Sequence, residues 1–581
     1  MFQILTLIIF VSIAQNSFGA TTAPSQIVPD VLDEIEKREI ENQKNKQILP
    51  EIRELDRLKK LDDPIKAKIN SLIIIAPKEL QTVIDFNKYK EQIVGKELSI
   101  NELNQFTKII GGEYIEKGYP LVRVTLPPQE LKPEGATLFF KVIDGFIEKI
   151  DLSRVPDNQR KVTFSFLREL IKKKQLQQSF LERKLLLAGN INGLSLTSAF
   201  SKGSNEGGTI LTVDAKHKYI SGSVQFNNTQ SEELARQLGI ISLSANSALG
   251  IGENLTLFGI ARPTLKGMKG TKEDVSIRGG GISLSAIIGN DGLKANLSYT
   301  ETMTRPGGDV RSLSLESNMK SGNFSLSYPL LLTARNTWSI RGSLGWTDEI
   351  QQTNSTGIDQ EISHDRLTSL RAGLTYFGCG FGCLTFDSQI SRGLEIASRS
   401  ASEATTGTPL SRTSGTSTYT HFRLNSSYSF VPFEKYLLKF IAGGQYTDDG
   451  LLNSEQTTIV GLDRISSLTS GAISGDKVWF LRSELTRSFN ITKQTNLSPY
   501  LYSAMGVAYL NKPTEAENKE TAAKSIGGGI IFNNFNNILS FDKNISAKLE
   551  YSKTIATDKI EKLSDVRLNK QHLLLILSMY F

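Results

Sequence analysis

The chain ends with Gln571-His-Leu-Leu-Leu-Ile-Leu-Ser-Met-Tyr-Phe581, a segment of strand length that decides how the rest is interpreted. From Leu573 onward every second residue is apolar, whereas the other face, which carries His572 and Ser578, is mixed in character. A continuous apolar face ending at a terminal aromatic residue is typical of the last strand of an outer-membrane β-barrel. On a soluble protein this end would promote aggregation. The segment therefore predicts that lipid covers the apolar face.

The overall composition favours a membrane barrel over a bundle of membrane helices. Hydrophobic residues make up 39% of the 581 residues, which is too few for a helical membrane protein. Transmembrane barrels are this polar because every second residue faces a wet interior. The net charge of +7 is spread along the chain, with no basic run dense enough to predict nucleic-acid binding.

The only long apolar run lies at the start of the chain. Residues 3–13 are apolar but too short to span a bilayer, and Ser17-Phe-Gly19 follows with small residues at the −3 and −1 positions of a cleavage site. A positively charged segment before the apolar core is missing. We expect residues 1–19 to be a secretory signal peptide.

Residues 28–48 have the composition of a highly charged helix. Glu and Lys or Arg alternate around its whole circumference, and its apolar residues are too sparse to bury one face in a core. Such a helix is either solvated or lies in a polar channel. Pro50 and Pro64 interrupt the helical pattern, so residues 49–66 are expected to be a linker.

Two small α+β units are expected next, at residues 67–145 and 146–216. In the first, Ser99 and Glu102 have the spacing of a capping box, and Gly118 is placed to end the helix that they begin. In the second, helices are expected at residues 163–174 and 178–189. The similar order of strands and helices indicates a tandem repeat of one small domain.

From residue 217 to residue 581 the helical patterns stop and 16 short segments of alternating hydrophobicity follow one another. Every second connection between them is short, whereas the intervening ones are long, for example residues 349–364, 393–416 and 447–476. Short turns on one side and long loops on the other are typical of outer-membrane barrels. The fold class predicted is therefore a membrane β-barrel of 16 antiparallel strands, preceded by a helix and two α+β domains.

Cys379 and Cys383 are the two cysteines of the chain and lie in a glycine-rich turn. In an oxidising compartment a single local disulfide is the preferred interpretation. A metal site would need further ligands, and no histidine lies nearby in the sequence.

The signal peptide, charged helix, tandem domains and barrel together resemble the two-partner secretion transporters (TpsB), outer-membrane proteins that export haemolysins and filamentous adhesins. The most specific stretch runs from Gly118-Tyr119 through Leu126-Pro127-Pro128-Gln129 to Asp144-Gly145. It is similar to the first polypeptide-transport-associated (POTRA) domain of that family, although Asp144 replaces a glutamate. A second match runs from Leu181-Glu-Arg183 to Asn192-Gly193, where Asn192 replaces the usual proline.

The resemblance implies that the POTRA domains bind an unfolded client in the periplasm and that the charged helix plugs the pore. The residues then expected to bind the client are Gly118, Tyr119, Leu126, Pro127, Gln129, Gly145 and Arg183.

The family also carries an arginine-glycine motif in the loop between strands 11 and 12, which enters the barrel and contacts an acidic residue on the wall. Here the motif falls on Ser466-Ser467-Leu468, and the wall reads Tyr502-Ser-Ala504-Met-Gly506. Both charged partners are therefore missing from these positions. We expect the loop to enter the lumen and to be held by neutral contacts around Ser466 and Ala504 in place of an ion pair.

The function implied is export of a partner exoprotein, of haemolysin or adhesin type, that carries an N-terminal secretion domain. Outer-membrane lipid and, during biogenesis, the barrel-assembly machinery are the other partners expected. A barrel-assembly insertase of the same superfamily normally has more POTRA domains and no plug helix, and a passive diffusion porin would leave residues 67–216 without a purpose. An enzyme or a cofactor is not expected, because the four histidines are scattered and no nucleophile elbow, Walker-type loop or metal spacing occurs.

Overall fold

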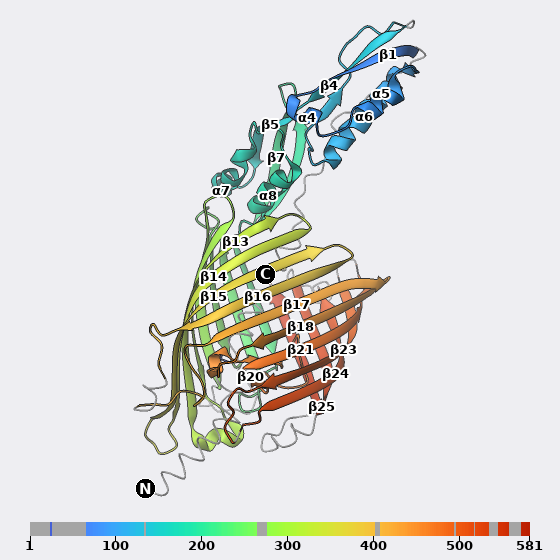
Figure 1. Cartoon of the computed structure of the whole chain (residues 1–581). Helices are drawn as coiled ribbons and strands as arrows, with labels where there is room; N and C mark the ends of the chain where they lie inside the picture. Colours follow the sequence, from blue (N-terminus) through green and yellow to red (C-terminus); the bar gives the residue numbers. More distant parts are fainter. Residues whose placement is uncertain are drawn as a thin grey trace.

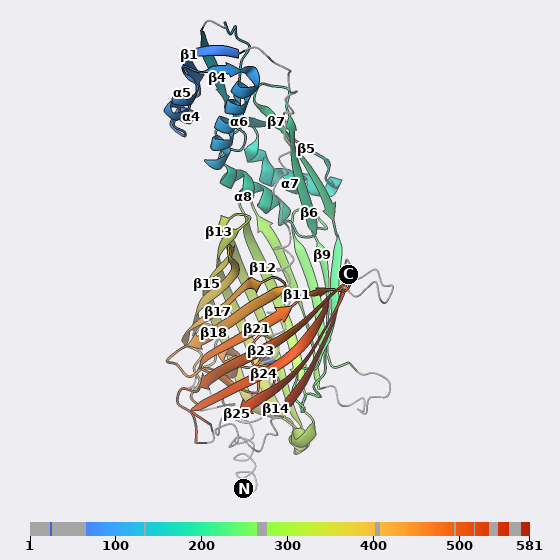
Figure 2. The same cartoon turned by 90° about the vertical axis from the view of Figure 1, so that its right-hand side faces the viewer.

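A computed structural model describes residues 24–25, 66–132, 135–263, 276–400, 407–492, 495–515, 517–533, 544–556 and 571–581. The expected signal peptide (1–19), the charged helix (28–48) and the linker (49–66), except for Lys66, lie outside these residues. The described chain forms two α+β domains stacked in line on one end of a large barrel (Figures 1 and 2). No helix among the described residues is both long and apolar enough to cross a bilayer.

The first domain packs its helices on one face of a four-stranded sheet with the order β2-β1-β4-β3. The longest helix begins at the predicted capping box, because the Ser99 side chain accepts from the Glu102 N–H and the Glu102 carboxylate accepts from the Ser99 N–H. Gly118, at φ +89°, ends it as predicted. The elements are β1 (Lys66–Ile75), α4 (Lys78–Gln81), α5 (Asn87–Ile93), β2 (Glu97–Ser99), α6 (Ile100–Glu116), β3 (Arg123–Thr125) and β4 (Ala136–Ile143).

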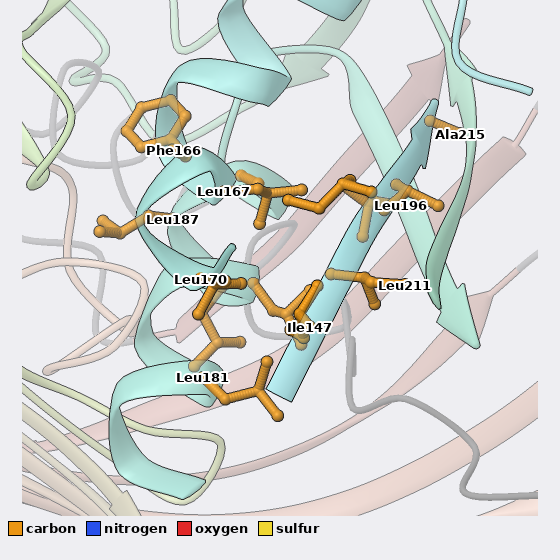
Figure 3. Packing of buried hydrophobic residues seen from close by; sticks show 14 of the residues in the cluster. Ile147, Phe166, Leu167, Leu170, Leu181, Leu187, Leu196, Leu211 and Ala215 are labelled. Atoms are coloured by element: carbon orange, nitrogen blue, oxygen red, sulfur yellow. The ribbon is translucent and has the colours of Figure 1, made fainter. Parts of the chain in front are cut away.

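The second domain repeats this plan around a three-stranded sheet with the order β5-β7-β6. Its first helix begins six residues before the expected start at 163, because Pro156 and Asp157 supply a helix start that the apolar pattern did not reveal. Figure 3 shows the core, in which Leu170 and Leu181 from the helical layer face Ile147 and Leu211 from the sheet. The elements are β5 (Phe146–Arg154), α7 (Asp157–Leu167), the 3₁₀ turn η2 (Arg168–Leu170), α8 (Gln178–Gly189), β6 (Leu194–Lys202) and β7 (Gly208–His217).

Sixteen antiparallel strands then close into a barrel in which the last strand pairs with the first, as predicted. Two strands are longer than the sequence pattern indicated, because their early residues lack a clean apolar alternation: β13 begins at Leu315 and β15 at Gln360. The strands are β8 (Ile220–Asn227), β9 (Leu238–Asn246), β10 (Asn254–Ala261), β11 (Ile277–Ile288), β12 (Leu293–Thr304), β13 (Leu315–Leu332), β14 (Asn336–Thr353), β15 (Gln360–Cys379), β16 (Gly382–Leu394), β17 (Thr420–Phe433), β18 (Tyr436–Tyr446), β21 (Lys477–Arg487), β23 (Asn496–Tyr509), β24 (Glu520–Asn533), β25 (Asn544–Ala556) and β26 (Gln571–Tyr580).

The remaining short elements lie at the ends of the strands. The segment β22 (Phe489–Asn490) pairs with the start of β23, and β19 (Thr457–Thr458) pairs with β20 (Ser474–Gly475) inside one long loop. Two 3₁₀ turns, η3 (Gly308–Leu313) and η4 (Asn453–Glu455), complete the described elements. A disulfide joins Cys379 at the end of β15 to Cys383 in β16, across a Cα–Cα distance of 4.1 Å.

The two faces of the terminal strand differ as its sequence predicts. The side chains of Leu573 and Leu577 are 57% and 40% exposed on the outside, whereas those of His572 and Ser578 are buried inside. Leu501 and Met505 in β23 likewise point outward. An apolar exterior around a polar interior is the arrangement that a surrounding lipid bilayer requires.

Candidate functional site

The long loop between β18 and β21, residues 447–476, folds inward and is called the lumen loop below. Its apolar side chains pack on the inward face of β23, where Tyr502 and Ala504 are buried. A Cβ built on Gly506 would lie 3.0 Å from Ile459 Cβ, so the missing side chain lets the loop approach the wall. The wall positions expected from the sequence are therefore those on which the loop packs. The buried apolar loop residues are Ile459, Val460, Ile465, Leu468 and Ile473.

Ser466, at the expected motif position, is buried among polar wall residues. Its Oγ accepts from Arg482 Nη1 at 2.9 Å and lies 2.8 Å from the Tyr502 hydroxyl. The same Oγ also hydrogen-bonds the Glu550 carboxylate. The next residue, Ser467, hydrogen-bonds Thr554 Oγ1 at 2.6 Å.

The expectation that only neutral contacts hold the loop at this point is wrong. Arg482 in β21 and Glu550 in β25 form an ion pair on the wall, 3.1 Å between Nη2 and Oε2, with both side chains fully buried. The Arg482 guanidinium also lies over the Tyr502 ring, 3.6 Å from its centre. Because a buried charge needs both a counter-charge and hydrogen bonds, Ser466 completes the environment of this pair. Ala504 contributes only apolar packing.

At the start of the lumen loop, Glu455 contacts basic side chains of the barrel wall, which is a second charged contact that the sequence analysis does not predict. Its carboxylate lies 2.6 Å from Arg371 Nη2 in β15 and 3.0 Å from His421 Nε2 in β17. Arg423 donates to the Glu455 backbone carbonyl at 2.7 Å. Here the loop therefore supplies the acidic residue and the wall supplies the basic residues. In the expected motif, by contrast, the arginine lies on the loop and the acidic residue on the wall. No motif in the sequence marked Glu455.

Asp476 secures the other end of the lumen loop. Its Oδ1 accepts from Arg412 Nη1 at 2.9 Å, and Arg412 belongs to the loop between β16 and β17. The same oxygen accepts from the Leu451 N–H at 3.1 Å, and Oδ2 accepts from the Asn511 N–H at 2.7 Å. One buried carboxylate thus ties both ends of the lumen loop to two neighbouring loops.

The expected client-binding glycines lie at the joint between the two α+β domains. The Gly118 carbonyl accepts from the Gln178 N–H at 2.8 Å. A Cβ on Gly145 would collide with the Leu121 carbonyl at 1.9 Å. The Asp144 carboxylate, whose pKa is raised by burial, accepts from the Gln175 N–H at 3.0 Å. The glycine motifs therefore fix one domain to the next.

Tyr119, Leu126, Pro127 and Gln129 are half-buried within the first domain. Tyr119 and Leu126 pack against its core. The Gln129 side chain donates to the Phe139 carbonyl at 2.9 Å and accepts from the Phe139 N–H at 2.8 Å, so it replaces a strand partner on β4 beyond the end of β3. The Pro127 carbonyl accepts a weaker bond from the same amide at 3.2 Å.

Arg183, a residue that the sequence predicts to bind the client, contacts the barrel. Its guanidinium donates to the Pro329 carbonyl at 2.9 Å, to the Asp291 carbonyl at 3.0 Å and to the Tyr328 hydroxyl at 3.2 Å. It also pairs with the Asp291 carboxylate at 3.3 Å. The reason is that α8 lies on the short turns of the barrel, where Leu332 joins the apolar core of the second domain.

One edge of the first domain is left open. Among the described residues, β2 pairs with β1 only at Lys66–Lys68, and β4 lies on the opposite side of β1. The outer edge of residues 70–75 therefore has no strand partner in the part of the chain that the structure describes. Ile73 and Ile75 on this stretch are 45% and 52% exposed. β1 lies at the end of the molecule away from the barrel (Figures 1 and 2).

The described residues include no group of three or more His, Cys, Asp or Glu side chains that could hold a metal ion. The features described above are an open strand edge, buried ion pairs and the lumen loop. An unpaired strand edge of this kind can form main-chain hydrogen bonds with an added extended segment.

Two protein families match this chain. The family described as haemolysin secretion/activation protein ShlB/FhaC/HecB matches residues 207–530, and the ShlB-type POTRA domain matches residues 75–145. The heme/hemopexin transporter protein HuxB of Haemophilus influenzae (strain 86-028NP) is 20% identical over 459 residues, 76% of each chain. The outer membrane transporter CdiB of Dickeya dadantii is 21% identical over 392 residues, 67% of this chain and 66% of its own.

Solved structures show the same fold. CdiB from Escherichia coli superposes with a TM-score of 0.69 at 17% identity, over 97% of this chain and 99% of that one. BamA from Haemophilus ducreyi, lacking POTRA domains 1–3, superposes with a TM-score of 0.50 at 12% identity, over 88% and 100%.

Proposed function

Because the chain belongs to the haemolysin secretion/activation protein family of ShlB, FhaC and HecB, we propose that it receives its client at the open edge of β1. The protein is an outer-membrane translocator that exports a partner exoprotein, with its POTRA domains in the periplasm. The finer proposal concerns the segment bound first, which we take to be an N-terminal secretion domain of the partner in extended form. The observation that carries the proposal is the strand edge at residues 70–75, which lacks a strand partner among the described residues and carries the exposed side chains of Ile73 and Ile75.

An unpaired strand edge favours an extended ligand for a physical reason. Its free N–H and C=O groups form main-chain hydrogen bonds with any added strand, and alternate side chains add apolar contacts. An unfolded exoprotein has unpaired backbone groups that can form these hydrogen bonds and accessible apolar side chains that can form these contacts. The expected client-binding role of Gly118, Tyr119, Leu126, Pro127, Gln129 and Gly145 becomes, in this proposal, the support of the domain that carries the edge.

Passage through the barrel requires a change in the lumen loop. In the arrangement described, this loop packs on the inward wall and is held at Glu455, Ser466 and Asp476. We infer that the client displaces it, and that folding of the client outside the cell supplies the free energy.

The charged helix at residues 28–48 remains a proposed plug; its neighbour Ser25 is buried beside Glu349 on β14. We also propose that the barrel-assembly machinery inserts the barrel.

Charges on the open edge test the proposal. Ile73→Lys with Ile75→Lys keeps the domain core, because both side chains are exposed, but places charge where a client strand would pair. We expect binding of the partner's N-terminal segment to weaken at least about tenfold, equivalent to 1.4 kcal/mol, and export to fall with it. The measurement is capture of that segment by the purified protein, together with partner released into the medium.

Ile109→Lys is the matched control, since Ile109 is 55% exposed in the same domain but lies on helix α6 and not on β1. Normal capture by the β1 variant, or equal losses in both variants, would contradict the proposal. A heat-modifiable barrel in each variant shows that the membrane domain has folded.

A further inference from the structure

The barrel seam, where β26 meets β8, is paired over only part of β26. The registered partners are Ser223–Asn227 of β8 and Ile576–Tyr580 of β26. On its other side, β26 pairs with β25 along its whole length, Gln571–Tyr580. Among the described residues, Gln571–Leu575 therefore has no strand partner on the β8 side. Unpaired backbone groups facing a bilayer are costly, so this part of the seam needs another form of closure.

A single asparagine supplies part of that closure. Asn228, immediately after β8, donates from Nδ2 to the Leu573 carbonyl at 2.7 Å, and its Oδ1 accepts from the Leu575 N–H at 2.7 Å. Its side-chain amide therefore takes the place of a backbone partner.

The lumen loop contacts both sides of the seam from inside the barrel. The Ser466 carbonyl lies 2.9 Å from Nδ1 of His572 on β26, and the Ser470 N–H donates to the Thr229 carbonyl, beyond β8, at 2.9 Å. His572 Nε2 lies 3.3 Å from the Asn228 carbonyl. Both neighbours of the imidazole are carbonyl oxygens, which can only accept from a ring N–H, and the Ser466 carbonyl is the nearer. The loop thus holds both sides of the seam.

We propose that the lumen loop is a latch on the barrel seam, with His572 as the positioning residue that holds the latch closed. The loop cannot leave the wall without releasing Ser466 from β26 and Ser470 from the end of β8. When a client displaces the loop, the seam loses its inner support and becomes the first boundary of the barrel to loosen. The inference goes beyond export itself, because it connects the state of the pore to the stability of one strand pair.

Hydrogen exchange of the full-length protein in lipid nanodiscs measures the seam directly. His572→Phe keeps a ring at this position and removes the N–H. We expect the amides of Ile576–Tyr580 and of β8 to exchange about 2- to 13-fold faster, the factor that loss of one ordinary hydrogen bond gives. His572→Asn places an amide N–H near the position of Nδ1 and should restore slow exchange. His364→Phe, which breaks a contact to Asp348 on the far strands β14 and β15, should leave the seam unchanged.

A double-mutant comparison separates the latch from a purely local effect of His572. Replacing residues 462–471 by a Gly-Ser linker removes the latch, and should speed exchange at the seam by at least as much as His572→Phe does. Adding His572→Phe to that variant should then change nothing further. Additive effects, or a seam that exchanges at the normal rate in either variant, would overturn the proposal, because the loop and the seam would then be independent.

Discussion

At the scale of single residues, Glu455 makes the closest charged contact between the lumen loop and the wall. Its carboxylate is buried and faces Arg371, His421 and Arg423 from two strands. Breaking such a pair leaves a buried charge without its partner, which costs more than the pair itself contributes. The loop is therefore more firmly held at Glu455 than neutral hydrogen bonds alone would allow.

Glu455→Gln should release the lumen loop, because Arg371 then lacks a counter-charge. We expect the loop anchor to be destabilised by about 3–5 kcal/mol, the usual cost of breaking a buried ion pair. Single-channel recordings in planar bilayers should show a larger and noisier conductance. Glu395→Gln is the matched control, because this glutamate is exposed in an outer loop. Identical conductance in the two variants would show that Glu455 does not hold the loop.

The sequence analysis located the position of the lumen loop on β23 but missed the acidic residues that hold the loop, Glu550 and Glu455. Ser466 and the wall face of Tyr502, Ala504 and Gly506 were found by spacing from a known motif, and the structure brings them together. Glu550 lies 84 residues from Ser466 along the chain, on another strand. Its proximity depends on barrel closure and strand register, which local patterns do not encode. Glu455 was missed for the same reason.

At the scale of elements, the joint between α8 and the barrel turns depends on Arg183. Burial acts to raise the pKa of Asp291, but the hydrogen bond from Tyr328 and the charge of Arg183 outweigh it, so the pKa lies below its ordinary value. A carboxylate of this kind stabilises the folded joint above its unfolded pKa, and its contribution is lost as the pH falls through the lowered value. The joint should therefore be insensitive to mild acid and loosen only below about pH 4.

Arg183→Met keeps the length of the side chain and removes its donors. Because Asp291 is half exposed, we expect the joint to lose only about 1–2 kcal/mol. Limited proteolysis should cut between the second domain and the barrel sooner than in the unaltered protein, and export should decline. Arg154→Met, which alters an exposed pair in the same domain, is the control. An unchanged cleavage rate in Arg183→Met would remove Arg183 from the joint.

Elements with strong local signals were predicted well, and those without them were not. Ser99, Glu102 and Gly118 marked both ends of α6. The start of α7 was misplaced, since Pro156 and Asp157 were not recognised as a helix start. The unpaired edge of β1 could not be predicted, because it depends on where the neighbouring strands stop.

At the scale of the whole molecule, the barrel follows from a repeated pattern in the sequence. Sixteen segments of alternating hydrophobicity, with short and long connections in turn, specify an up-and-down barrel without reference to any single contact. This pattern cannot predict which segments and side-chain contacts fill the lumen. The lumen loop, the seam and the joint to the second domain all depend on residues far apart in sequence. Their contacts arise only after the barrel has closed.

The central claim is that the partner leaves through the lumen and that the lumen loop must move. Ser467 and Thr554 hydroxyls lie 2.6 Å apart, so Ser467→Cys with Thr554→Cys should form a disulfide that fastens the loop to β25. In cells that make the transporter and its partner, the oxidised double variant should release no partner into the medium, while each single variant exports normally. Reductant should restore release in the double variant. Normal release by the oxidised double variant would contradict the account.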